Sequence, residues 1–166
     1  MNKTYRITCT GYDLCMHQPF IGRVAKNMHD TRIRAIEAAQ LAALEDINAL
    51  AINKGLAHPL SLTVNLNDKK QQDCTELTNA ATIMYVGEDG DVHLYSEYQV
   101  WEITERDNTH TNFLYRGFRV EYDTNDHWYW IFYQSDERTH RWSGRSLEAC
   151  CDIIDEVCND MILMGT

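Results

Sequence analysis

The chain has 166 residues and a formal net charge of −10, with 44% apolar and 24% charged residues. This length fits one domain or two very small ones, and the composition is that of a folded protein, which excludes a disordered chain. The acidic balance argues against direct binding of nucleic acid or of an anionic membrane, because both require a surplus of Lys and Arg.

The chain begins with MNKTYR, which lacks the apolar segment of a signal peptide. No stretch reaches the roughly 18 apolar residues of a membrane span. We therefore expect a cytoplasmic protein. The six cysteines would be reduced there, and none form a C-x-x-C pair, so we interpret them as buried apolar side chains. The sequence predicts no metal and no cofactor.

The N-terminal part predicts two strands. Residues 4–10 alternate between apolar and polar side chains, which is typical of a half-buried strand. Residues 20–25 fit a second strand, which Pro19 and Gly22 restrict to an edge or a bulge.

A helix and a third strand complete this part. Apolar residues recur every three or four positions over residues 31–51, which predicts a helix with Asp30 as its N-cap and Gly55 after its end. Residues 60–66 alternate as a strand, and the polar residues 67–79 predict a long loop or a boundary.

The rest of the chain predicts a run of strands and one final helix. Polar turns separate the segments with the strand pattern, namely residues 81–86, 92–95, 98–104, 115–122, 128–133 and 139–142. Ser146 is the expected N-cap of a helix over residues 147–163. The predicted fold class is α+β: an antiparallel meander packed by the C-terminal helix (residues 80–166), with a strand–helix–strand unit before it (residues 1–66). The two units are either separate lobes or parts of one continuous sheet.

The negative charge is concentrated in two blocks. Residues 61–110 have ten acidic and three basic residues, and residues 146–166 have five acidic and no basic ones. The five carboxylates of the final helix are predicted on one side of it, opposite the apolar stripe: Glu148, Asp152, Asp155, Glu156 and Asp160. A second acidic point is the predicted turn with Glu88, Asp89 and Asp91.

Carboxylates one helical turn apart are about 5–6 Å from each other, a spacing that resembles that of neighbouring phosphates on a nucleic-acid strand. Two interpretations follow. The helix presents either the solvated face of an acidic protein, or a surface that docks on a basic groove normally occupied by nucleic acid.

Residues 128–133 read WYWIFY and are aromatic on both faces of the predicted strand. The final helix can cover only one of these faces. The other is either core beneath the first helix or an exposed strip, which could stack bases or form a protein interface such as a homodimer.

Catalytic and metal sites have weaker support. His127 beside Asp126, and His140 near Glu137, could form acid–base pairs, but histidines often lie next to acids in turns. The chain has no G-x-S-x-G, H-E-x-x-H, phosphate-loop or dinucleotide motif. A small enzyme that uses His127 and His140 remains an alternative.

The last third of the chain resembles small accessory proteins of phages and mobile elements. The resemblance is carried by GFRVEY at residues 117–122, Trp128, SLEA at residues 146–149 and Ile154-Asp155. Proteins of this kind include anti-CRISPR and antirestriction inhibitors of bacterial defence, so the resemblance implies binding without catalysis. We expect a non-catalytic inhibitor that uses its acidic, partly phosphate-mimicking surfaces to bind a basic surface of a nucleic-acid-handling protein or complex. If a phage encodes it, the protein would act in the cytoplasm of the host cell. The alternatives are a homodimeric accessory protein and the small enzyme.

Overall fold

A computed structural model of the chain describes residues 3–12, 19–24, 28–52, 61–86, 89–105, 112–133 and 142–164. These residues form nine strands and two helices, and the predicted α+β class is confirmed. The strands are β1 (Lys3–Tyr12), β2 (Pro19–Val24), β3 (Ser61–Leu66), β4 (Leu77–Val86), β5 (Val92–Glu105), β6 (Asn112–Tyr115), β7 (Phe118–Asp123), β8 (Trp128–Tyr133) and β9 (Trp142–Gly144). The helices are α1 (Arg32–Ile52) and α2 (Leu147–Met164).

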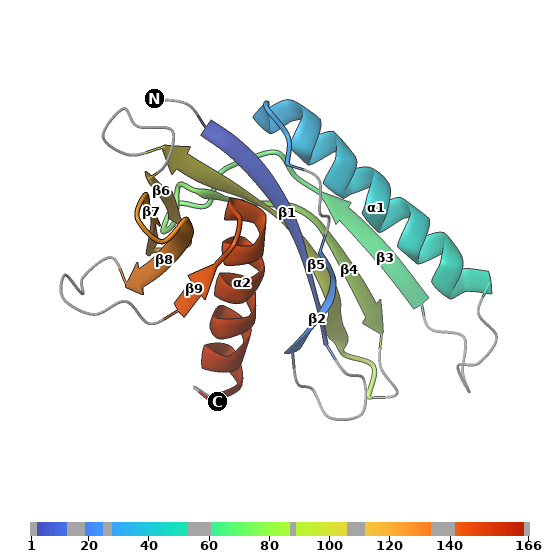
Figure 1. Cartoon of the computed structure of the whole chain (residues 1–166). Coiled ribbons are helices and arrows are strands. Elements are labelled where there is room, and N and C mark those ends of the chain that lie inside the picture. Colours follow the sequence, from blue (N-terminus) through green and yellow to red (C-terminus); the bar gives the residue numbers. More distant parts are fainter. Residues whose placement is uncertain are drawn as a thin grey trace.

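All strands belong to one antiparallel sheet that branches at β5 (Figure 1). One edge of β5 pairs with β1, which in turn pairs with β2. The other edge pairs first with β4, as far as Trp101, and then with β6 at Thr104 and Glu105. One branch therefore continues from β4 to β3, and the other runs from β6 through β7 and β8 to β9. The strands of both predicted units share this sheet.

The two helices cover opposite faces of the sheet. Successive side chains of a strand point to opposite faces. On β5, Val100 packs in the core beneath α1, whereas Trp101 packs in the core beneath α2. Figure 1 shows α1 along the β3–β4 branch and α2 in the curve of the other branch.

The middle of β1 is buried on both faces, with Arg6 on the side of α2. The prediction of a half-buried strand is wrong, because Arg6 and Thr8, on the side expected to face solvent, are 0% and 4% exposed. Ile7 and Cys9 pack toward α1 as expected. Polar side chains in this buried part of the strand must find partners inside the protein.

The connections differ from the prediction in three places. The predicted strand over residues 115–122 is a hairpin, because Arg116 and Gly117 adopt φ angles of 50° and 82° and turn the chain back. The predicted loop over residues 67–79 is shorter, since β4 begins at Leu77. The predicted segments 92–95 and 98–104 form the single strand β5.

The helix N-termini are capped by hydroxyl side chains. Ser146 is confirmed as the N-cap of α2, where its Oγ accepts a hydrogen bond from the Ala149 N–H at 3.0 Å. At α1 the cap is Thr31, whose Oγ1 accepts from the Arg34 N–H at 3.3 Å, and the prediction of Asp30 is wrong. Asp30 instead lies 3.6 Å from the Arg34 guanidinium.

Candidate functional site

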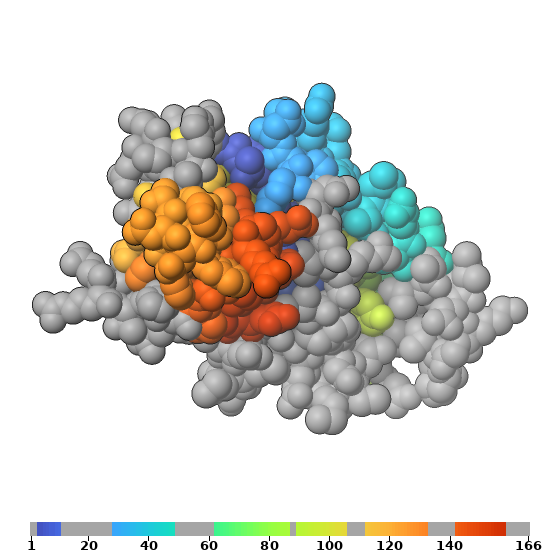
Figure 2. Space-filling view, in the orientation of Figure 1, coloured from blue at the N-terminus to red at the C-terminus, as the bar shows by residue number. Residues whose placement is uncertain are grey.

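The candidate partner-binding surface is the exposed side of α2. The buried side of this helix packs Cys150, Cys151 and Ile154 against the sheet, each 0% exposed, which confirms the predicted apolar stripe. The helix has an acidic residue in its first turn and no basic residue in its last turn. Figure 2 shows that the described part of α2 reaches the molecular surface beside β7 and β8.

Three predicted carboxylates form a column along the exposed side of α2. Glu148, Asp152 and Glu156 are four residues apart, which places each one turn below the last. Asp152 and Glu156 are exposed and Glu148 is half-buried. Asp160 lies one turn further along the helix, but its side chain is outside the part of the structure that is described. We call Glu148, Asp152 and Glu156 the acidic column.

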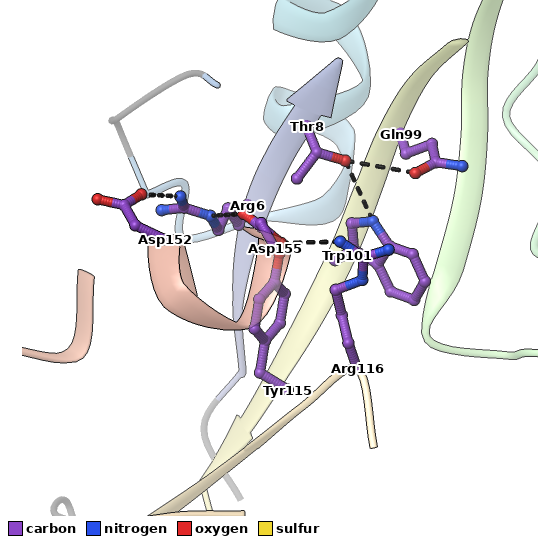
Figure 3. A network of polar contacts seen from close by, with 8 residues as sticks. All are labelled: Arg6, Thr8, Gln99, Trp101, Tyr115, Arg116, Asp152 and Asp155. Atoms are coloured by element: carbon purple, nitrogen blue, oxygen red, sulfur yellow. Dashed lines mark hydrogen bonds and ion pairs between the residues drawn. The ribbon is translucent and has the colours of Figure 1, made fainter. Parts of the chain in front are cut away.

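The prediction that Asp155 belongs to this exposed surface is wrong. Its side chain is 3% exposed and lies at the centre of a polar network (Figure 3). Oδ2 accepts a hydrogen bond from Arg6 Nε at 3.1 Å. Oδ1 accepts one from the Tyr115 hydroxyl at 2.5 Å and one from Arg116 Nη1 at 2.9 Å. Asp155 follows Ile154 directly and lies one turn after Cys151, so it shares their side of the helix.

The network explains how charged groups are tolerated between α2 and the sheet. A buried carboxylate is stable only when it is paired and its oxygens are hydrogen-bonded, and here two guanidinium groups and a hydroxyl meet that need. Burial and the neighbouring Asp155 charge raise the pKa of Tyr115 well above its usual value, so the hydroxyl remains a donor. Burial opposes the positive charge of Arg6, but the nearby carboxylates outweigh it and raise the Arg6 pKa.

The same network reaches the acidic column through Arg6. Arg6 Nη2 pairs with Asp152 Oδ1, although the Asp152 side chain is still 49% exposed. The Arg6 side chain is 0% exposed, so Asp152 sits at the border between the buried network and solvent. No local sequence pattern indicates this arrangement, because Arg6 and Asp155 are 149 positions apart.

The second predicted acidic point lies elsewhere on the molecule. Asp89 and Asp91 are exposed at the turn between β4 and β5, and Glu88 is outside the described residues. Asp89 is 3.0 Å from His93 Nε2, and this contact lowers the Asp89 pKa. In Figure 1 β1 and β2 lie between this turn and α2, so the two acidic points do not form one surface.

The aromatic strand β8 is divided between core and surface. Ile131 is buried toward α2 and Tyr129 packs with it. On the opposite face Trp128 is 36% exposed, and Trp130 and Phe132 are half-buried. The Arg145 and Arg119 guanidinium groups lie 5.4 and 4.6 Å from the ring centres of Trp128 and Phe132. No described element packs over this outer face.

Of the two acid–base pairs that the sequence suggests, only His127–Asp126 lies in the described part of the chain. His127 Nδ1 is 3.3 Å from the Tyr122 hydroxyl, and no contact with Asp126 is formed. His140 lies outside the described residues. Across the described residues no three His, Cys, Asp or Glu side chains are grouped so that they could hold a metal ion.

Comparison of the chain with protein-family models, curated proteins and solved structures gave no significant match. Neither α1 nor α2, the helices of the described residues, has the length and apolar composition needed to cross a membrane.

Proposed function

We propose that the protein is a non-catalytic inhibitor that docks through the exposed side of α2 onto a basic surface of a nucleic-acid-handling protein or complex. The observation that carries the proposal is the acidic column, which lies on a helix that has no Lys or Arg. Like charges one turn apart destabilise a helix by about 0.2–0.5 kcal/mol per pair, and lysines at these positions would remove that cost. An arrangement that is unfavourable for the helix alone is favourable for a positively charged partner.

The way in which α2 packs on the sheet supports the same proposal. The hydrogen bonds of Asp155 to β1 and to the β6–β7 turn fix the rotation of the helix about its axis, and so fix the direction in which the acidic column points. Charges held in place before binding lose less conformational freedom on binding. Complementary charge mainly raises the association rate and selects the partner. The assignment of the partner to a host defence system rests on the resemblance of the last third of the chain to phage accessory proteins.

The proposal is tested by reversing two charges of the column. Glu148→Lys/Glu156→Lys leaves Asp152 and its contact with Arg6 intact. Glu37→Lys/Glu45→Lys is a matched control, since these two residues are exposed on α1, are also eight positions apart and give the same change of net charge. Each form is used to capture proteins from a lysate of the source organism, with and without added duplex DNA. The captured protein is then purified, and its association with each form is followed at low and high salt.

We expect the wild type and the α1 variant to capture the same nucleic-acid-binding protein, and DNA to compete for it. The α2 variant should associate at least about tenfold more slowly at low salt, and the difference should shrink at high salt. Equal association of both variants, or capture that DNA does not reduce, would contradict the proposal.

A homodimer formed through the outer face of β8 is the second candidate function. The observation that favours it is the exposed Trp128 beside the half-buried Trp130 and Phe132. Light scattering at rising concentration distinguishes the candidates. A dimer that Trp128→Ser converts to a monomer would support it, and a monomeric wild type would exclude it.

A further inference from the structure

The branch of the sheet leaves a pocket beside β5. Between the part of β5 that pairs with β4 and the part that pairs with β6, the two neighbouring strands diverge. A pocket of about 600 Å³ lies there, lined by Trp101 and Glu102 of β5, by the turn at Arg116 and by Cys74 and Cys158. Pockets that hold small molecules usually measure about 300–1,000 Å³.

An arginine enters this pocket from an unusual backbone position. Arg116 and Gly117 are the two turn residues between the paired ends Tyr115 and Phe118, with φ angles of 50° and 82°. Two-residue turns of this kind favour Asn, Asp or Gly, because a longer side chain is strained at a positive φ. The Arg116 guanidinium lies 4.4 Å from the centre of the Trp101 ring. Figure 3 shows the two side chains next to each other.

The guanidinium of Arg116 keeps hydrogen-bond donors available. Nη1 donates to Asp155 at 2.9 Å, and Nη2 has no hydrogen-bond partner among the described residues. The side chain is 15% exposed and lines the pocket. A guanidinium group only donates hydrogen bonds, so the ligand atoms that contact it must be hydrogen-bond acceptors. An anionic acceptor gives the strongest bond.

The charges around the pocket limit a ligand to a low negative charge. Arg116 shares Asp155 with the buried Arg6, and Arg6 is also paired with Asp152. Glu102 is paired with Lys70 at 2.9 Å and with Lys3 at 3.4 Å. Glu76 also lines the pocket and is exposed, and it would repel a ligand with a higher negative charge.

We propose that this pocket binds a small organic carboxylate with an apolar body. The carboxylate accepts hydrogen bonds from Arg116, and the apolar body lies against Leu114 and the indole of Trp101. This site is separate from the acidic column and does not depend on the proposed inhibitor function.

The probes are two molecules with the same apolar body. 3-Phenylpropionate carries a carboxylate, and phenethylamine carries an amine in its place. Binding to the full-length protein is measured by saturation-transfer NMR at millimolar probe concentration. We expect 3-phenylpropionate to bind and phenethylamine not to bind, because only the carboxylate can accept from Arg116. Binding of both probes with equal strength, or of neither, would overturn the proposal.

Three variants locate the site. Arg116→Gln should weaken binding of 3-phenylpropionate at least about tenfold. Arg119→Gln is the matched control, because Arg119 also stacks on an aromatic ring, Phe132, but does not line the pocket. Cys74→Phe fills the pocket from a half-buried position and leaves the contact between Arg116 and Asp155 in place, so it remains informative if Arg116→Gln fails to fold. Unchanged binding in Cys74→Phe would overturn the proposal.

Discussion

The two helices of this protein are held to the sheet by different kinds of contact. Beneath α1 most of the contact is made by small apolar side chains, since Ala35, Ala39 and Ala43 are each 0% exposed. The sheet also donates one hydrogen bond to this helix, from the buried Tyr98 hydroxyl to the half-buried Asp46. Beneath α2 the contact combines apolar side chains with the Asp155 network.

This difference matters for what each helix can do. Small apolar side chains allow close approach, but dispersion contacts have little directional preference. Charge-assisted hydrogen bonds hold their atoms at defined distances and angles. We infer that α1 serves mainly to close the core, whereas α2 is held at a fixed rotation that presents its outer face.

The largest effect is expected from Asp155→Ala. The substitution leaves Arg6 buried with its Nε unpaired, and removing one partner of a buried ion pair costs about 3–5 kcal/mol. Urea unfolding gives the free energy directly. Glu156→Ala is the control, because this neighbour is exposed and should change stability by no more than about 0.5 kcal/mol. Equal effects of the two substitutions would show that the network does not hold α2.

A smaller effect is expected from enlarging an alanine beneath α1. Ala39→Leu adds three carbon atoms where the side chain has no exposed surface, and overpacking of this kind costs about 1–3 kcal/mol. Leu41→Ala on the same helix is the control, since Leu41 is 58% exposed. The free energies of unfolding of both variants are compared with the wild type. An Ala39→Leu variant as stable as the wild type would mean that α1 does not pack on the sheet as closely as the structure indicates.

The same contrast explains which parts could be predicted from the sequence. The apolar spacing over residues 31–51 and the stripe Cys150–Ile154 recur at helical periods, so both helices and the buried side of α2 followed from local pattern. On α1 the same spacing includes Ile33 and Leu44, which are 68% and 39% exposed. The strand WYWIFY was also identified correctly as β8. Such signals are local, because each depends on residues within a few turns of one another.

The buried network could not be predicted, because its signal is not local. Asp155 is acidic like Asp152 and Glu156, and only the position of Arg6 on a distant strand shows that it is buried. The hairpin at Arg116 was missed because Arg–Gly is not a usual turn pair, and the same error hid the pocket. The one sequence signal that could have indicated the burial of Asp155 is its position next to the apolar stripe of the helix.

The smallest effects are expected from two glutamates of β5 that differ in their partners. Glu97 is half-buried and pairs with no described cation, and burial raises its pKa. Glu102 is also desolvated, but Lys70 and Lys3 outweigh the burial and lower its pKa. We expect Glu97→Gln and Glu102→Gln to change the pH dependence of stability in opposite directions, measured by urea unfolding between pH 3 and pH 7, a range that spans the usual carboxyl pKa values of about 3.9–4.3.

The signs follow from proton linkage. A carboxyl with a raised pKa binds more protons in the folded state, so its contribution to stability falls as pH rises through the unfolded and then the folded pKa. Glu97→Gln removes that loss, so the stability of the variant relative to the wild type should increase toward pH 7. A carboxyl with a lowered pKa contributes stability above its unfolded pKa and loses it as pH falls through the folded pKa. The stability of Glu102→Gln relative to the wild type should therefore decrease toward pH 7. If the pH dependence of stability were the same in the two variants, the partners of a buried carboxylate would not decide how this sheet tolerates it.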